Sequence, residues 1–299
     1  MITPLLNWTV ERMAVNRMVN IKRALKPLIP DSLLSARARQ RARQHFRQHL
    51  RPTDVFLVGH PKSGNTWLAY MLGIVLRERF APHQITLANI QDFVPAFHAR
   101  DHQIAEYANH PDPRIFRNEG PVHPELYPKS IYILRDPRAA LVSYYHHCVH
   151  DFPEYPWKLD DFIDEIMAHG CIRRVESHLI RWDKQVLLWI ERAKRQPVKM
   201  VRYEDMHQDR GKVLREVVAF VGIDCPPADL DLAVERSSFE NMRENEQTFG
   251  AEPYSGTKGE RGFFTRRGKV DGWKDELTPL LVQRIEHEFA EAMRATGYV

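Results

Sequence analysis

The pattern of hydrophobic and polar positions after Asp54 predicts strands and helices in alternation. Short apolar runs rich in β-branched residues indicate buried strands at 54–59, 113–117, 130–135 and 197–203. Apolar residues at helical spacing predict helices at about 66–79, 137–147, 177–194, 209–221, 228–236 and 278–295. Such alternation is typical of an α/β fold with three layers, in which helices flank both faces of a central parallel sheet. Ligands of these sheets bind beyond the carboxyl ends of the strands.

Two segments depart from this pattern. Residues 241–272 are dominated by Gly, Pro, Asn, Glu and Arg, and we expect them to form a binding loop or lid. Residues 1–51 predict two helices, at about 4–25 and 31–50, interrupted by prolines. The predicted organisation is therefore a basic helical N-terminal appendage over 1–51, followed by an α/β domain over 52–299.

The charge of the chain is concentrated in that appendage. Residues 1–51 hold eleven Lys and Arg against two acidic residues, a net charge of +9, although the whole chain carries only +4. The remainder is therefore slightly acidic, at −5. We favour solvent-facing helices packed on the domain, and weak contact with an anionic membrane surface is the alternative. Nucleic acid is not expected as a partner, because no aromatic residues interleave the arginines as a base-stacking surface requires.

Composition and cysteine usage narrow the class of protein. The 299 residues are 43% hydrophobic and 27% charged, which is typical of a globular protein and argues against disorder. The longest apolar stretch, at 69–76, is far shorter than the roughly 20 residues that cross a bilayer. Cys148, Cys171 and Cys225 lie far apart, which argues against a secreted disulfide framework. With no apolar signal segment at the N-terminus, we expect a cytoplasmic protein.

The segment from Gly59 to Trp67, GHPKSGNTW, predicts a phosphate site between the first strand and its helix. It fits the P-loop template G-x-x-x-x-G-K-S/T, except that Asn65 stands where the template has lysine. The glycines let backbone N–H groups point at one phosphate, and the following helix adds its positive end. The lysine lies inside the loop instead, at Lys62, where it would meet a bond next to a 5′-phosphate. The alternative is a tight turn without a ligand.

Five motifs in order make the chain resemble the PAPS-dependent sulfotransferases, which use 3′-phosphoadenosine 5′-phosphosulfate (PAPS) as sulfonate donor. The loop resembles their P-K-S-G-T-T-W, and YILRDPRAALVSYYHH at 132–147 resembles their 3′-phosphate strand and helix. RYEDM at 202–206, SSF at 237–239 and the RRG and GWK pieces at 266–274 match further motifs. The resemblance implies a P-loop-type fold, PAPS as donor co-substrate, and no metal.

The donor-binding residues that this resemblance implies surround the two phosphates and the adenine. They are Lys62, Ser63, Gly64, Asn65, Thr66, Trp67, Arg135, Ser143, Tyr203, Ser238, Phe239, Phe264, Arg266, Arg267 and Gly268. Of these, Arg135, Ser143, Arg266 and Arg267 are expected at the 3′-phosphate, and the aromatic residues at the adenine. An arginine fork with a hydroxyl suits a phosphate monoester.

The predicted chemistry is an in-line sulfonate transfer to an acceptor hydroxyl or amine. By the resemblance, Lys62 stabilises the leaving oxygen, and Ser143 restrains that lysine until acceptor binds. Many relatives use the histidine of K-T-H-x-P as the base, whereas this chain has Glu119 there and Arg117 at the lysine position. We favour Glu119 as the base, with His123 as competitor. Arg117 would either lower the pKa of Glu119 by pairing with it or contact the sulfonate.

The acceptor is not fixed by the sequence. Segments 81–112, 148–160 and 241–262 match no motif and are expected to wall the acceptor, which is either a small molecule or a carbohydrate. The sequence also leaves undecided whether the protein forms a homodimer. Two alternative functions also stay open: a P-loop kinase or nucleotidase that uses Asp136 for Mg²⁺, and a non-catalytic PAPS-binding module.

Overall fold

The computed structural model describes residues 36–80, 84–97, 101–152, 157–172, 179–251 and 265–299. The chain divides into two compact units, Met1–Gln44 and His45–Val299, and the sheet and the site belong to the second. The helix predicted at 4–25 and the adenine candidate Phe264 lie outside the described residues. The helix predicted at 31–50 is α2, Ala36–His49.

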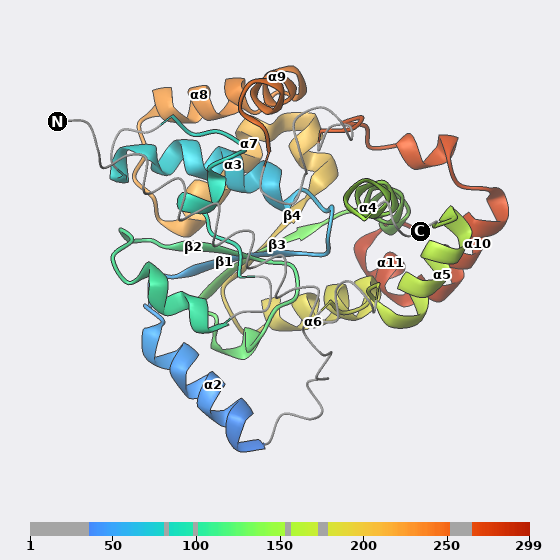
Figure 1. Cartoon of the computed structure of the whole chain (residues 1–299), viewed down its shortest axis with the longest axis horizontal. Coiled ribbons are helices and arrows are strands. Elements are labelled where there is room, and N and C mark those ends of the chain that lie inside the picture. The colour runs from blue at the N-terminus through green and yellow to red at the C-terminus, as the bar shows by residue number, and fades with distance from the viewer. Residues whose placement is uncertain (1–35, 81–83, 98–100, 153–156, 173–178, 252–264) are drawn as a thin grey trace. The chain divides into compact units, whose positions relative to one another are not determined.

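The described strands form one parallel sheet in the order β2-β1-β3-β4 (Figure 1). Its strands are β1 (Val55–Gly59), β2 (Ile115–Asn118), β3 (Lys129–Leu134) and β4 (Val198–Arg202). The strand β1 is central, with Val55 in register with Ile115 on one side and Lys129 on the other. The predicted α/β fold with a central parallel sheet is confirmed.

Alternate side chains of each strand enter two separate hydrophobic clusters, because successive residues of a strand point to opposite faces. Leu57 and Ile131 belong to one cluster, and Phe56 and Tyr132 to the other. Figure 1 shows α3, α7 and α8 on the side of the sheet that bears Leu57 and Ile131, and α6 with α11 on the opposite side. The sheet is thus the middle of three layers.

The helices around the sheet have the following bounds. They are α3 (Asn65–Leu76), α4 (Pro137–Asp151), α5 (Leu159–His169), α6 (Trp182–Ala193), α7 (Tyr203–Val221), α8 (Pro227–Arg236), α9 (Phe239–Phe249), α10 (Pro279–Glu288) and α11 (Ala290–Thr296). Short 3₁₀ helices lie at Arg77–Arg79, Ile90–Asp92, Asp101–Tyr107, Pro124–Leu126 and Gly272–Asp275.

The structure differs from the sequence expectations in four places. Residues 241–249, expected to form a loop, belong to α9, and most of α5 was not expected at all. The helix expected from 177 begins only at Trp182, because Arg181 has extended backbone. The long helix expected at 278–295 is divided at Phe289, which leaves the helical region at φ −106° and ψ 17°.

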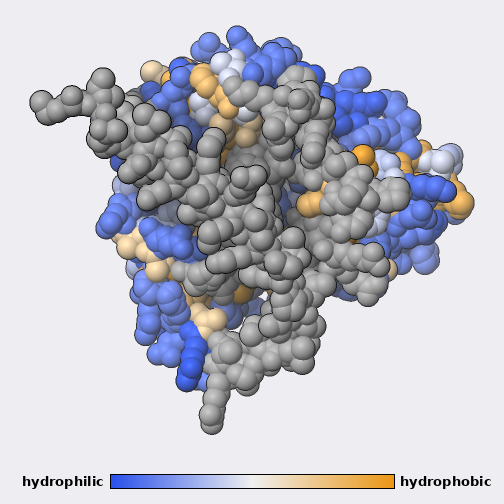
Figure 2. Space-filling model, in the orientation of Figure 1, coloured by the Kyte–Doolittle hydropathy of each residue, from blue (hydrophilic) through white to orange (hydrophobic). Residues whose placement is uncertain are grey.

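Few large hydrophobic side chains are exposed among the described residues. On the face drawn in Figure 2, hydrophobic residues lie singly or in small groups among hydrophilic ones. The large hydrophobic residues with exposed side chains are Val149, Ile180, Phe249, Leu280 and Val299. Within the described ranges no helix has the length and apolar character needed to span a membrane.

Candidate active site

Each strand ends in a residue or segment that the sequence placed in the site. The phosphate loop follows β1, Glu119 follows β2, Arg135 follows β3 and Tyr203 follows β4. The chain runs from β1 to β2 on one side and then to β3 on the other, so the order of the strands reverses beside β1. A reversal of this kind opens a crevice at the carboxyl edge of the sheet. The topology therefore gathers the predicted residues at one edge.

The phosphate loop has the backbone of an anion cradle. Gly64 caps α3 in the left-handed region at φ 106°, and a Cβ there would meet Tyr203 Cδ2 at 2.8 Å. Lys62 is also left-handed, at φ 64°, which is uncommon for a residue with a side chain. Ser63 is fully buried, and its Oγ has no partner among the described residues. An unsatisfied hydroxyl beside the first turn of α3 fits a phosphate group.

Arg135 ties the third strand to this loop. Its Nη1 donates to the carbonyl oxygen of Lys62 at 2.6 Å, and its guanidinium lies 3.9 Å from the ring centroid of Tyr203. The residue is 8% exposed, burial lowers its pKa, and its Nε has no partner within the described part of the chain. A buried guanidinium with a spare N–H fits an anionic ligand.

Aromatic side chains gather beside the loop. The ring centroid of Trp67 lies 5.7 Å from that of Tyr203 and 5.0 Å from that of His207, and its Nε1 donates to Ser237 O at 2.9 Å. Sequence reasoning missed His207, whose position one turn after Tyr203 was the available signal. Its Nε2 is 2.9 Å from the Tyr203 hydroxyl, and burial lowers its pKa.

Ser238 and Phe239, the last two residues of the SSF motif, lie at the start of α9. Ser238 is the N-cap of that helix, with its Oγ accepting from Asn241 N at 3.1 Å. Phe239 packs closely on Gly268, where a Cβ would meet the Phe239 ring at 2.4 Å. This close approach brings the segment that carries Arg266 and Arg267 against the start of α9.

Both of these arginines are paired with Glu276. The carboxylate accepts from Arg266 Nη1 at 2.9 Å, lies 3.2 Å from Arg267 Nη1, and contacts His146 Nε2. Burial alone would raise the pKa of Glu276, but hydrogen bonds from His146 and Arg266 hold it below the usual range. This pairing could not be predicted from the sequence, because the partners come from separate segments.

Two α9 residues that sequence reasoning also missed anchor the same segment. Glu246, a buried residue, accepts from Thr265 N at 2.9 Å and from Thr265 Oγ1 at 2.7 Å. Arg243 Nη1 donates to Thr265 O at 2.9 Å. Their i, i+3 spacing was the signal that α9 exists. Together they hold Thr265, the residue before the arginine pair, against α9.

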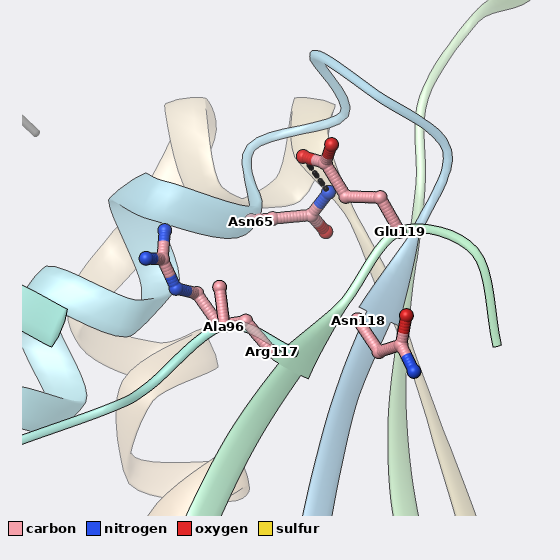
Figure 3. Close-up of a pocket in the computed structure, with 5 residues that line it drawn as sticks. All are labelled: Asn65, Ala96, Arg117, Asn118 and Glu119. Atoms are coloured by element: carbon pink, nitrogen blue, oxygen red, sulfur yellow. Dashed lines mark hydrogen bonds between the residues drawn. The ribbon is translucent and has the colours of Figure 1, made fainter. Parts of the chain in front are cut away.

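A small pocket lies between the phosphate loop and the end of β2 (Figure 3). It is lined by Asn65, Ala96, Arg117, Asn118 and Glu119. The Arg117 guanidinium points toward α3, where its Nη1 donates to Thr66 Oγ1 at 3.1 Å, whereas the Glu119 carboxylate points toward the loop. Asn65 Nδ2 donates to Glu119 Oε1 at 3.2 Å.

Comparison with known proteins decides the family. The sequence model described as "Sulfotransferase domain" matches residues 52–297. The chain belongs to this family. The predicted sulfotransferase resemblance is therefore confirmed, and so is the prediction that the chain is an enzyme. The match begins just after the predicted appendage, whose boundary at 51/52 stays a prediction.

Relatives and solved structures agree with this assignment. The sulfotransferase is 27% identical to a guinea pig (Cavia porcellus) 3-beta-hydroxysteroid sulfotransferase, over 83% of this chain and 86% of the relative. It is 26% identical to a rabbit (Oryctolagus cuniculus) amine sulfotransferase, over 82% of each chain. A mouse sulfotransferase complexed with PAP superposes with a TM-score of 0.60 at 25% identity, over 85% of this chain and 89% of that one. A retinol dehydratase structure shares the fold, with a TM-score of 0.58 at 18% identity and coverage of 84% and 85%.

The other candidate residues of this sulfotransferase are His123, Ser143 and Asp136. His123 begins a 3₁₀ helix, its Nδ1 3.8 Å from Glu125 Oε1 and its ring 6.2 Å from that of Phe46. Ser143 is half-buried on α4. Asp136, the magnesium candidate of the kinase alternative, caps α4 and pairs with Arg138 at 2.7 Å. Within the described residues, no group of three or more His, Cys, Asp or Glu is arranged to hold a metal ion.

Proposed function

We propose that this sulfotransferase moves the sulfonate of PAPS to a hydroxyl or amine of a small-molecule acceptor and releases adenosine 3′,5′-bisphosphate (PAP). The single observation that carries the donor assignment is the buried Ser63 hydroxyl, which lies unsatisfied at the start of α3 next to the left-handed Lys62. The PAP named for the mouse structure supports the same donor. The steroid and amine relatives support a small-molecule acceptor over a carbohydrate.

In this proposal the loop residues hold the 5′-phosphate and neutralise the leaving group. The backbone N–H groups of Gly64, Asn65 and Thr66, with the Ser63 hydroxyl, bind the phosphate oxygens. PAPS, when bound, supplies an activated sulfonate whose bond to the bridging oxygen breaks. Lys62 neutralises the negative charge that grows on that oxygen, and a fixed cation does this without a metal. Ser143 restrains the Lys62 amine from α4.

The 3′-phosphate and the adenine have separate candidates. Arg135, Arg266 and Arg267 would bind the phosphate, with Ser238 and the backbone at Gly268 beside them. Trp67, Tyr203 and Phe239 would contact the adenine, as the cluster around Trp67 and the packing of Phe239 on Gly268 suggest. Because Glu276 holds Arg266 and Arg267, nucleotide binding requires these arginines to exchange one anion for another.

Glu119 is the proposed base. It takes the proton of the acceptor as the new bond to sulfur forms, so the carboxylate must face the donor. Its hydrogen bond to Asn65 in the phosphate loop supports Glu119, and the contacts of His123 with Glu125 and Phe46 make His123 the weaker candidate. Arg117, whose Nη1 donates to Thr66 Oγ1, is the proposed contact of the sulfonate oxygens.

Binding and turnover measurements test this function. We expect PAP to bind without Mg²⁺ and more tightly than ATP with Mg²⁺, and we expect radiolabelled PAPS to label a pool of hydroxylated or amine small molecules. Tighter binding of Mg²⁺–ATP would favour a kinase or nucleotidase. PAPS binding without labelling of any pool would favour a non-catalytic module.

A further inference from the structure

The side chain of Asn65 connects the phosphate loop to the proposed base. Its Nδ2 lies 3.2 Å from Glu119 Oε1, 3.2 Å from His60 O and 3.3 Å from Gly59 O, and the residue is 4% exposed. Figure 3 shows the amide reaching across the pocket to the carboxylate. This is the position at which the P-loop template has lysine. The side-chain amide of Asn65 thus faces Glu119, and Asn65 is also the first residue of α3.

The orientation of this amide is fixed by its surroundings. The two loop carbonyl oxygens can only accept hydrogen bonds, so the NH₂ group of Asn65 must face them. Its Oδ1 is then buried with no partner among the described residues. A Cβ at Gly59 would lie 2.4 Å from that oxygen, so the glycine provides the space that the amide fills. A buried unsatisfied oxygen is unfavourable, and such groups call for a functional explanation.

A second amide holds the main chain of Glu119. Gln185, which is fully buried on α6, donates from Nε2 to Glu119 O at 2.8 Å. Its Oε1 accepts from the Tyr132 hydroxyl, with 3.4 Å between the oxygens, and this sets the orientation of the Gln185 amide. Glu119 is thus held at its backbone from α6 and at its carboxylate from the phosphate loop.

A neutral donor suits a carboxylate that must act as a base. A lysine at position 65 would stabilise the charged carboxylate and make it a weaker proton acceptor, whereas an amide orients the carboxylate without adding a full charge. A base that is misplaced by about 1 Å can lose roughly a hundredfold in rate. We propose that Asn65 is a positioning residue, which aims the Glu119 carboxylate at the acceptor through its Nδ2 hydrogen bond.

This inference depends on the proposed function, and a double-mutant cycle tests it separately. Asn65→Ala is made in the wild-type chain and in Glu119→Gln, and kcat and PAP affinity are measured for all four proteins. In the wild-type chain we expect kcat to fall about 10- to 100-fold, with less than about a threefold change in PAP affinity. In Glu119→Gln, the same substitution should lower kcat by less than about twofold, because no base remains to be aimed.

A purely structural role for Asn65 gives a different result. Equal losses of kcat in both backgrounds, or a loss that falls mainly on PAP affinity, would overturn the positioning role. If Glu119→Gln retains wild-type turnover, the base assignment and this inference both fail, although sulfotransfer stands. If the wild-type protein labels no acceptor, the proposed function itself fails. Should Asn65→Ala not fold, Asn65→Ser, with a shorter donor that stays inside the loop, takes its place in the same cycle.

Discussion

At the scale of single residues, the phosphate loop combines three unfavourable features within four positions. His60 is buried without a partner for its Nε2, Lys62 has a left-handed backbone, and Ser63 has an unsatisfied hydroxyl. Each costs folding free energy in the absence of a ligand. Their concentration in one turn indicates that the turn is built for binding, since a purely structural turn would be expected to avoid all three.

Lys62→Gly and Lys62→Asn separate the amine from the backbone. Glycine and asparagine tolerate the left-handed region that Lys62 occupies at φ 64°, so the free energy of unfolding should change by less than about 1 kcal/mol in either variant. Turnover should fall by about a hundredfold or more, because the charge at the leaving oxygen is lost. Denaturant unfolding and steady-state assays measure the two effects. Near-normal turnover of Lys62→Asn would contradict the leaving-group role.

His60 makes stability depend on pH. Burial lowers its pKa to about 4 from 6.5, so the folded protein keeps it neutral while the unfolded chain binds a proton. Its contribution is therefore fully present above pH 6.5 and is lost as the pH falls toward 4. Between pH 7 and pH 5, the free energy of unfolding should fall by about 2 kcal/mol less in His60→Phe than in the wild type. Urea titrations at the two values check this, and parallel pH curves would refute it.

At the scale of elements, polar segments were the hardest to predict from sequence. In α9, Met242 and Glu246 are buried, so the apolar stripe that identifies a helix is nearly absent from its sequence. The strands were placed well, because buried parallel strands are short apolar runs. The residues that follow the strands were predicted because they belong to motifs that the sequence shares with the family. Gln185 and Glu276 were not, since only the tertiary fold brings them to Glu119 and to the arginine pair.

Glu276, the C-cap of the 3₁₀ helix Gly272–Asp275, should compete with the nucleotide for the arginine pair. It holds Arg266 and Arg267, so Glu276→Gln should tighten PAP binding several-fold by removing a competing anion. Asp275→Asn is the matched control, because Asp275 lies 3.6 Å from Arg267 with 68% of its side chain exposed. Calorimetric titration with PAP measures both. Weaker binding to Glu276→Gln would mean that the carboxylate preorganises the arginines instead.

At the scale of the whole molecule, the end of α2 is part of the core of the second unit. Phe46 is 1% exposed, and its ring centroid lies 5.9 Å from that of Phe56, 6.5 Å from that of Phe97 and 6.1 Å from that of Tyr127. Phe46 belongs to the segment that the sequence predicted as a basic helical appendage, whereas its three partners belong to the predicted domain. The basic residues of this segment therefore indicate which positions face solvent, but they do not reveal that Phe46 is a core residue.

Phe46→Ala should lower the free energy of unfolding by about 3–5 kcal/mol, because it opens a cavity among aromatic rings. Phe249→Ala is the control, since Phe249 is 41% exposed and its truncation should cost at most about 0.5 kcal/mol. Denaturant midpoints of the two variants give the comparison. Similar small losses for both would show that Phe46 adds little to the core.

The anchoring of Thr265 by α9 has a consequence for engineering. Chain positions 250 and 265 are both tied to one helix, the first as its C-cap and the second through Arg243 and Glu246. The length of a segment inserted between positions 250 and 265 then has little effect on stability, because doubling the length of a loop costs only about 0.6 kcal/mol. The sequence predicts that residues up to 262 wall the acceptor, so we expect cassettes exchanged over 251–262 to change the acceptor range while the adenine candidate Phe264 is kept.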